Sequence, residues 1–546
     1  MAKITMDGME YEVSDGLTVV QASAEVGITV PHYCYHPTLP APANCRMCLV
    51  ELTLPGAPGP LRQLATGCST RVADGMVVNH ETPTVQAARA SSLESLLAHH
   101  PLDCPTCDQA GECELQNFAH KFGHDVGNYA ETKKTPPRKH LGPNVDLFTT
   151  RCVMCTRCAR FTEEVSGDAV LSLVNRGGKN EIDVYPGIPI DNKLSGNVVD
   201  LCPVGALSST DFMYRSRPWF LEEVDSVCTR CSKGCNITVE HRDGETVRIK
   251  PRLNEDVNGF WMCDDGRYEC GYVNSPDRLR MPLAREGDDL VACGWSDVFD
   301  RIAGAVQAAG GENVAVIASA WSTNEELHAV RRFATEAVRT SLIGLLSAAG
   351  DDEDTVYPGF TIEKDKNPNR AGARLILGDE VAQDSAIWDV LRRAKAAIVF
   401  SGIPDAELSD DAVDALEALD FLAVVDVGTS ALTALADVVI PGTAYTEKDG
   451  CFTNSQQRVQ KLNAAHRPLG TAMREWEFVK YAAEALGAEF DYTDEASVTA
   501  DLVASTPAFA GVTLEAVGER GYVLGSGEAE PEANDGNYAY AKMFWK

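Results

Sequence analysis

The stretch RCVMCTRCARF, from Arg151 to Phe161, places three cysteines at intervals of three residues, and LCPVGAL, from Leu201 to Leu207, adds a fourth beside a proline. Three thiolates on one tight turn can hold three corners of a cubane iron–sulfur cluster, which a remote Cys-Pro can close. The sequence has no second CxxCxxC run, as a two-cluster ferredoxin would. We therefore expect one [4Fe–4S] cluster with the ligands Cys152, Cys155, Cys158 and Cys202 (the third set in chain order).

The first cysteine set lies upstream, in CYHPTLPAPANCRMC from Cys34 and in TGC ending at Cys68. A long loop around a small cluster, closed by a distant cysteine, follows the logic of plant-type ferredoxins, although the spacing differs. KITMDG and EYEVSDG predict short strands, and VVQASAEVG predicts a helix ended by Gly27, so a β-rich domain precedes this loop. These features favour [2Fe–2S] over tetrahedral zinc. The ligands would be Cys34, Cys45, Cys48 and Cys68.

The second set lies in HHPLDCPTCDQAGEC, His99 to Cys113, just after a helix predicted over 85–100. Three thiolates and one imidazole could hold a cluster or zinc, or the histidine could cap the helix. An imidazole in place of a thiolate removes a negative charge and should raise a cluster's potential. Spacing alone leaves the choice between His99 and His100 open. The cysteines are Cys104, Cys107 and Cys113.

The fourth set, in CTRCSKGC and FWMC, fits a [4Fe–4S] cluster, with a zinc ribbon as the alternative. Its members are Cys228, Cys231, Cys235 and Cys263. Four sets within 263 residues argue against independent zinc sites and for a row of redox centres. The remaining cysteines have no partner spacing and are expected to be small buried apolar residues. They are Cys270, Cys293 and Cys451.

Charge and length narrow the function classes. The chain has 546 residues, 80 acidic against 48 basic, with a formal net charge of −32, which disfavours nucleic acid as a partner. No apolar run approaches the roughly 18 residues of a membrane-spanning helix, and the charged opening MAKITMDGMEYEV is unlike a secretory signal. We expect a cytoplasmic protein of several domains, with thiols that bind clusters rather than form disulfides.

After about Pro282 the pattern alternates between strands and helices. NVAVIAS, RLILG, AAIVF, FLAVVDV and DVVIP are predicted strands, and 296–309 and 323–338 are predicted helices, the second with a capping box of Thr323 and Glu326. Such alternation predicts a doubly wound parallel sheet with helices on both faces. The tail after about Gly487, with GSGEAEPEANDGN near its end, is expected to be weakly ordered or partner-dependent.

These motifs closely resemble the large iron–sulfur subunit of respiratory complex I, the proton-pumping NADH:quinone oxidoreductase. The resemblance covers roughly the first 280 residues and extends to HPLDCPTCDQAGECELQ, the SGN at 195–197, LCPVGAL and the RPW at 217–219. It implies His100, not His99, as the nitrogen ligand of a [4Fe–4S] cluster, [2Fe–2S] on the first set and [4Fe–4S] on the third. The fourth set matches a cluster found only in some members, which points to a bacterial origin.

From Cys228 onward the chain also resembles molybdopterin oxidoreductases such as formate dehydrogenases. ADVVIPGTAYTEKDGCFTNSQQRVQ is similar to their motif at Gly450, Asn454, Arg458 and Gln460, with Cys451 where threonine is usual. The region is far shorter than a full molybdenum domain, and it shows no convincing metal-ligating Cys or Ser with catalytic His and Arg neighbours. We therefore expect a degenerate domain without molybdopterin.

The predicted architecture is multidomain, α+β and α/β. We expect a ferredoxin-like β-grasp [2Fe–2S] domain (1–80), a [4Fe–4S] module with one histidine and three cysteine ligands (81–140), a [4Fe–4S] module (141–220) and a molybdopterin-oxidoreductase-type [4Fe–4S] module (221–280). A shortened doubly wound α/β domain (281–485) and a C-terminal tail (486–546) follow.

The sequence has no Walker A motif, no convincing GxGxxG after a strand and no Ser/His/Asp arrangement, so NADH is not expected to bind this chain. The resemblance implies that a flavin- and NADH-binding partner delivers electrons to the first set. They would pass to the third and second sets and leave toward quinone-side iron–sulfur subunits, in a complex peripheral to the inner membrane. The alternatives are a subunit of an NAD-linked formate dehydrogenase or hydrogenase, and a zinc-bound scaffold.

Overall fold

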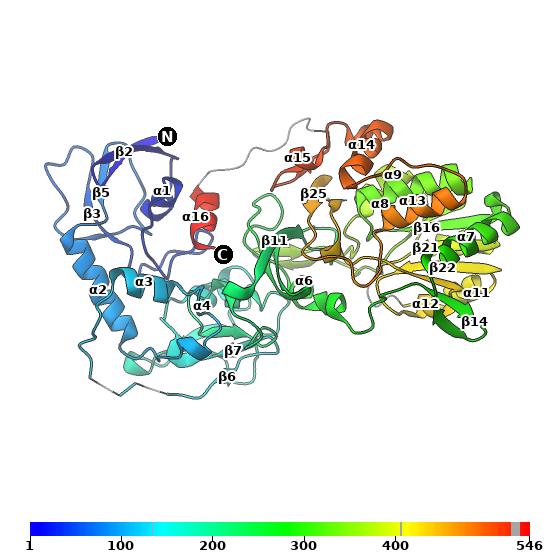
Figure 1. Ribbon diagram of the computed structural model, residues 1–546. Coiled ribbons are helices and arrows are strands. Elements are labelled where there is room, and N and C mark those ends of the chain that lie inside the picture. The colour runs from blue at the N-terminus through cyan, green and yellow to red at the C-terminus, as the bar shows by residue number, and fades with distance from the viewer. Residues whose placement is uncertain (131, 134, 404–406, 526–535, 546) are drawn as a thin grey trace. The chain divides into compact units, whose positions relative to one another are not determined.

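The computed structural model describes residues 1–130, 132–133, 135–403, 407–525 and 536–545 (Figure 1). The chain forms two compact units. Unit 1 comprises Met1–Leu221, Tyr357–Phe360 and Ala533–Lys546, and unit 2 comprises Glu222–Val356 and Thr361–Glu532. No helix in the described ranges is long and apolar enough to cross a membrane.

Unit 1 opens with a five-stranded sheet of order β2-β1-β5-β3-β4. The two short strands predicted at the start of the chain form a hairpin, and its turn uses Asp7 and Gly8, both with positive φ. The loop that carries Cys34, Cys45 and Cys48 lies between α1 and β3. The elements are β1 (Ala2–Met6), β2 (Met9–Val13), α1 (Val19–Glu25), β3 (Leu49–Thr53), β4 (Ala65–Thr66) and β5 (Met76–Asn79).

The rest of unit 1 consists of short elements that carry the second and third cysteine sets. Helix α2 (Pro83–Leu97) begins at the cap Thr82 and ends just before the two histidines. The elements that follow are α3 (Glu114–Phe122), β6 (Lys139–His140), β7 (Val145–Leu147), α4 (Arg157–Glu164), β8 (Leu171–Val174), β9 (Glu181–Val184), α5 (Asn197–Leu201), β10 (Leu207–Ser209) and the C-terminal α16 (Gly536–Phe544).

Unit 2 begins with an antiparallel sheet and continues into an eight-stranded sheet of order β15-β14-β23-β22-β21-β16-β17-β20. The six strands from β23 to β20 are parallel neighbours, and β14 and β15 form an antiparallel edge. The first sheet contains β11 (Glu222–Val227), β12 (Asn236–Arg242) and β13 (Glu245–Pro251). The second contains β14 (Leu283–Glu286), β15 (Asp289–Ala292), β16 (Val314–Ser319), β17 (Ile343–Leu346), β20 (Ala382–Gln383), β21 (Ala396–Phe400), β22 (Phe421–Asp426) and β23 (Val438–Pro441).

Alternate residues of the central strands face two separate cores. Val314, Val316 and Ala318 belong to one core, and Ala315 and Ile317 belong to the other. Helices pack on both faces, as the α/β prediction required (Figure 1). One face carries α7 (Trp295–Ala309), α8 (Asn324–Arg332), α9 (Arg370–Leu377), α13 (Glu475–Ala485) and α14 (Glu495–Ser505). The other carries α10 (Ala386–Arg392), α11 (Asp410–Glu417) and α12 (Ala431–Leu435).

Two local predictions were wrong. RLILG, predicted as a strand, is the end of helix α9, which stops before Gly378 at φ +97°. The tail was expected to be weakly ordered or partner-dependent, yet within this single chain it forms α14, α15 (Leu514–Val517), β26 (Tyr522–Val523) and α16. Most of GSGEAEPEANDGN lies outside the described residues. Strand β26 extends the sheet of β24 (Gly450–Thr453) and β25 (Arg458–Leu462).

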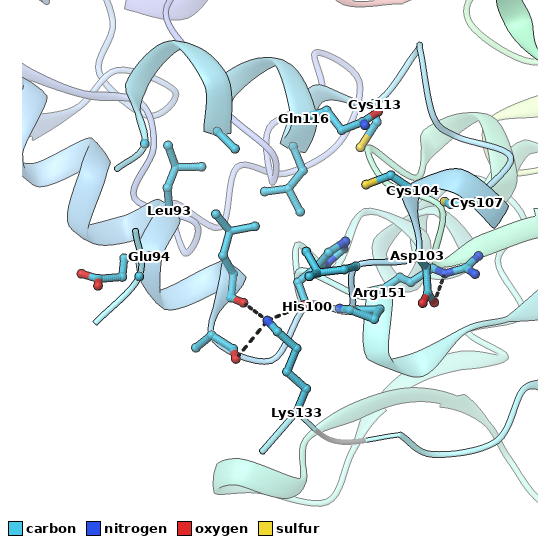
Figure 2. A pocket seen from close by; sticks show the side chains of 18 of the residues that line it. Leu93, Glu94, His100, Asp103, Cys104, Cys107, Cys113, Gln116, Lys133 and Arg151 are labelled. Carbon is cyan, nitrogen blue, oxygen red and sulfur yellow. Dashed lines mark hydrogen bonds and ion pairs between the residues drawn. The ribbon is translucent and has the colours of Figure 1, made fainter. Parts of the chain in front are cut away.

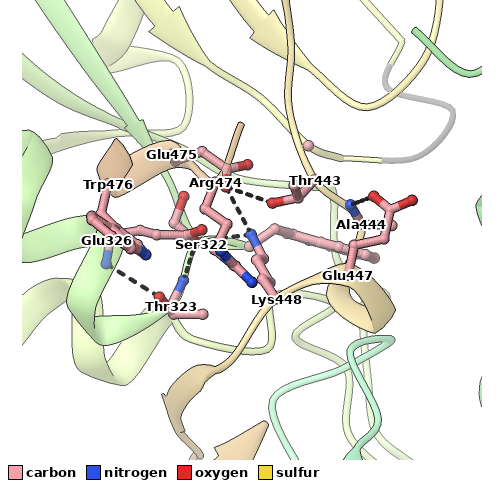
Figure 3. Close-up of polar contacts among 12 residues, drawn as sticks. Ser322, Thr323, Glu326, Thr443, Ala444, Glu447, Lys448, Arg474, Glu475 and Trp476 are labelled. Atoms are coloured by element: carbon pink, nitrogen blue, oxygen red, sulfur yellow. Dashed lines mark hydrogen bonds and ion pairs between the residues drawn. The ribbon is translucent and has the colours of Figure 1, made fainter. Parts of the chain in front are cut away.

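A buried ion network joins three segments of unit 2. The Lys448 ammonium lies 2.8 Å from Glu326 Oε2 and 3.3 Å from Glu475 Oε2 (Figure 3). Glu326 also closes the predicted capping box with Thr323, which the structure confirms. The network therefore ties the starts of α8 and α13 to the segment that precedes β24.

Candidate metal centres

The four cysteines of the first set converge beside the N-terminal sheet. Side-chain hydrogen bonds join Cys34 to Cys45 and Cys68, which lowers the pKa of the Cys34 thiol and raises the pKa of the other two. Backbone N–H groups also donate to the sulfurs, from Tyr33 to Cys45 at 3.4 Å and from Cys68 to Cys48 at 3.5 Å. Converging sulfurs that receive amide hydrogen bonds fit a small thiolate-bound cluster.

The second set lines a cavity of about 470 Å³ in unit 1 (Figure 2). His100, Cys104, Cys107 and Cys113 all contribute to its wall. His99 is exposed and is not among the lining residues. The geometry therefore separates two adjacent histidines that spacing could not.

His100 is held in the state that a metal ligand needs. Burial lowers its pKa to about 4, and the neighbouring cations Lys133 and Arg151 act in the same direction, so the ring is neutral at pH 7. Its Nδ1 atom is buried and has no hydrogen-bond partner among the described residues. A neutral imidazole with an uncommitted nitrogen is a suitable ligand for iron or zinc.

Two basic side chains fasten the loops of this cavity. The Lys133 ammonium donates to the carbonyls of Leu97 at 2.9 Å and His100 at 2.6 Å, where helix α2 ends (Figure 2). Arg217, in the RPW motif, donates to the carbonyls of Pro105 and Cys107. The spacing of the cysteines could reveal neither of these basic residues, although Arg217 belongs to the RPW motif.

The third set gathers around the start of α4. Met154 and Thr156 have φ of +53° and +61°, and these left-handed residues form the tight turn between the cysteines. Cys152, Cys155 and Cys202 all act electrostatically on Cys158. Burial raises the pKa of Cys155 to about 11, so cluster binding there would have to displace the thiol proton.

Two arginines of α4 join the first set to the third. Arg160 donates to the Cys34 carbonyl at 2.5 Å and to the Cys155 carbonyl at 3.3 Å. Arg157 donates to the carbonyl of Tyr35, the neighbour of Cys34, and to that of Leu201, the neighbour of Cys202, at 3.4 Å. Both arginines lie in the motif RCVMCTRCARF, but the spacing of its cysteines assigns no role to them.

The third set is also in contact with the second, through LCPVGAL. Cys113 Sγ lies 4.0 Å from the carbonyl oxygen of Pro203, which follows Cys202. Gly205 packs so closely on Cys107 Sγ that a Cβ atom there would overlap the sulfur. Any residue other than glycine at position 205 would therefore place its side chain where the Cys107 sulfur lies. The third set thus contacts both of the other sets in unit 1.

Three cysteines of the fourth set, Cys228, Cys231 and Cys235, lie in unit 2 in the connection between β11 and β12, where the Cys228 N–H donates to the Cys235 carbonyl at 2.8 Å. Cys263 follows β13 in the chain and acts electrostatically on Cys235. The segment that resembles a molybdopterin motif holds this loop. Asn454 donates to the Lys233 carbonyl at 3.1 Å, and Gln460 donates to the Gly234 carbonyl at 2.8 Å. All four cysteines are buried: Cys228, Cys231, Cys235 and Cys263.

Of the remaining cysteines, Cys451 is buried in β24 as expected, whereas Cys270 and Cys293 are partly exposed, so for these two the burial prediction was wrong. Within the described ranges, no group of three or more His, Cys, Asp or Glu side chains is arranged to hold a single metal ion. The fit of the four sets to clusters therefore rests on sulfur burial, amide donors, the free His100 nitrogen and the space left by Gly205.

Known families match the chain in a row, each of the first four spanning one ligand set. Residues 1–83 match the 2Fe-2S iron-sulfur cluster binding domain and 89–127 the NADH-ubiquinone oxidoreductase-G iron-sulfur binding region. Residues 142–208 match the NADH-quinone oxidoreductase subunit 3 ferredoxin-like domain, and 221–271 the NADH-ubiquinone oxidoreductase NDSU1/NuoG-like 4Fe-4S domain. Residues 371–485 match molybdopterin oxidoreductase.

Comparisons with whole proteins point to the same family as the domain matches. The chain is 29% identical to the mitochondrial NADH-ubiquinone oxidoreductase 78 kDa subunit of Candida albicans over 91% of this chain and 84% of that protein. It is 39% identical to the G subunit of NADH-quinone oxidoreductase from Rickettsia felis over 58% of this chain and 46% of that protein. The corresponding G 2 subunit from Rhizobium meliloti is 32% identical over 83% of this chain and 54% of that protein. The matches thus span about half the length of these bacterial relatives.

Among solved structures, an NAD+-reducing [NiFe]-hydrogenase chain matches 39% of this chain at a TM-score of 0.33, with 24% identity over 90% of that chain. The ordered series of matched domains and the near full-length fungal relative agree on one assignment. The chain belongs to the family of large iron–sulfur subunits of NADH–quinone oxidoreductase, respiratory complex I, with a molybdopterin-oxidoreductase-like C-terminal domain.

Proposed function

We propose that this chain relays electrons within complex I through clusters held by its four ligand sets. A [2Fe–2S] cluster would occupy the first set and a [4Fe–4S] cluster each of the others. The ligands would be Cys34, Cys45, Cys48 and Cys68; His100, Cys104, Cys107 and Cys113; Cys152, Cys155, Cys158 and Cys202; and Cys228, Cys231, Cys235 and Cys263.

The observation that carries the proposal is that residues beside the third set contact both other sets in unit 1. Arg160 contacts the backbone of both Cys34 and Cys155, and Cys113 contacts the neighbour of Cys202. Residues beside the third set therefore contact both other sets, although the third set follows both of them in the sequence. A series of adjacent sites is the arrangement that supports short electron-transfer steps.

When bound, the clusters would supply one-electron chemistry. The chain's own residues hold the sites at fixed separations, exclude water through burial, and place positive charge beside the ligands through Arg157, Arg160 and Lys133. Electrons would enter at the first set from a flavin- and NADH-binding subunit and leave at the second set toward a quinone-side iron–sulfur subunit. Docking to these partners would place the chain beside the membrane.

Metal analysis and EPR of the full-length chain, purified with its cofactors, test this function. Reduction with dithionite should give one [2Fe–2S] signal together with [4Fe–4S] signals, and iron should far exceed zinc. Stoichiometric zinc without a reducible centre would contradict the proposal and support a zinc scaffold.

A further inference from the structure

The C-terminal helix α16 packs on the domain that carries the first cysteine set. It contacts α1 in unit 1, and Gln21 donates from its side-chain nitrogen to Asn537 Oδ1 at 3.0 Å (Figure 1). The helix is separated from this domain by more than 500 positions in the sequence. The last residues of the chain therefore complete the first domain.

Aromatic side chains of α16 enclose the loop around Cys34. The Tyr540 ring lies 5.5 Å from the His32 ring, and the Phe544 ring lies 4.5 Å from it, both measured between centroids. Trp545, just beyond the helix, lies 5.1 Å from the ring of His36. The contacts surround the two histidines that flank Cys34 at positions 32 and 36.

The Tyr540 hydroxyl is the polar centre of this contact. It is 3.1 Å from His32 Nε2 and 3.2 Å from the carbonyl oxygen of Tyr35, and it accepts a hydrogen bond from Arg157 at 3.3 Å. Tyr540 is only 1% exposed, so these contacts are shielded from water. One hydroxyl thus fixes both the loop beside Cys34 and the arginine that reaches the third set.

We propose that Tyr540 is a positioning residue for the first centre. Its hydroxyl holds the Arg157 guanidinium between the carbonyls of Tyr35 and Leu201, and thereby sets the charge beside the Cys34 ligand and the contact between the first and third sets. This role rests on the proposed [2Fe–2S] site. It also assigns a function in the N-terminal domain to the C-terminus of the chain.

The variant Tyr540→Phe tests the role, because it removes the hydroxyl and keeps the ring. The full-length chain is reduced stepwise, and the [2Fe–2S] EPR signal is followed to obtain its midpoint potential. We expect a lower potential, because a less firmly held Arg157 stabilises the added electron less well. Iron release from this centre to a chelator should be about tenfold faster, as for the loss of one charge-assisted hydrogen bond.

Asn537→Ala is the matched control, since it removes a contact between α16 and α1 that does not touch the Cys34 loop. It should leave the potential unchanged. An unchanged potential and release rate in Tyr540→Phe would overturn the proposal, as would equal shifts in both variants, which would mean that the hydroxyl matters only for helix docking. A wild-type chain without a reducible [2Fe–2S] signal would instead contradict the proposed function on which this role depends.

Discussion

The choice of His100 over His99 depends on the surroundings of two identical side chains. Both follow helix α2, but of the two only His100 lines the cavity of the second set, and its buried Nδ1 has no hydrogen-bond partner in the part of the chain that the structure describes. Lys133 holds the His100 carbonyl in place, which fixes the backbone from which the ring projects. Burial and the contact with Lys133 thus favour His100 as the nitrogen ligand, a choice that the spacing of the cysteines left open.

Replacing His100 by cysteine should keep a cluster on the second set and lower its midpoint potential, because a thiolate adds a negative charge where the imidazole had none. EPR-monitored redox titration of the full-length chain measures this shift. The control His99→Ala should leave the centre and its potential intact. Loss of the centre in His99→Ala would show that the nitrogen ligand is misassigned.

At the scale of elements, the sequence predicted the central strands well and failed where a short apolar run was ambiguous. Strands β16, β21, β22 and β23 are continuous buried runs, which parallel sheets covered on both faces require. RLILG has a similar apolar character but lies in α9, where Ala373 and Ile376 are buried at helical spacing. Gly378 directly after it is a helix-ending signal that could have decided the case.

The Lys448 network gives a stability prediction for unit 2. Lys448→Met would leave the Glu326 carboxylate buried without its cation, beside the Glu475 carboxyl group whose pKa is raised by burial and by Glu326, and loss of such a cation typically costs about 3–5 kcal/mol. The urea midpoint of unit 2, followed by tryptophan fluorescence, measures the loss. Arg301→Met, which breaks the more exposed pair with Asp297, should cost at most about 1 kcal/mol. Equal losses of stability in the two variants would show that the buried network stabilises unit 2 no more than an exposed ion pair does.

Glu325, in helix α8, makes the stability of unit 2 depend on pH. Burial raises the pKa of Glu325 to about 7 from an ordinary value of 4.5, so the folded state holds this proton more tightly than the unfolded state. The contribution of Glu325 to stability is therefore greatest below pH 4.5 and is lost as the pH rises through about 7, by about 3 kcal/mol.

Glu325→Gln should remove this decline, because glutamine does not titrate. Urea midpoints of the two proteins at pH 5 and pH 8 give the comparison, and the wild-type protein should lose more stability between them than the variant. Parallel losses in the two proteins would show that Glu325 titrates normally.

At the scale of the whole molecule, the sequence predicted the kind of domain in each segment better than the contacts between the segments. The four cysteine sets could be proposed as ligands from the sequence because ligand spacing is local. The contacts of the third set with the other two could not be derived from spacing, because they depend on Arg157, Arg160 and Gly205, which join distant loops. Helix α16 had no recognisable signal, since its partners lie at the opposite end of the chain.

The central claim is that the third set connects the first to the second. Cys155→Ala in the assembled complex should remove the third centre and interrupt that connection. After rapid mixing with NADH and freezing, EPR should show the first centre reduced and the second still oxidised, while dithionite reduces both and proves that both are present. Reduction of the second centre by NADH at the wild-type rate in this variant would contradict the account.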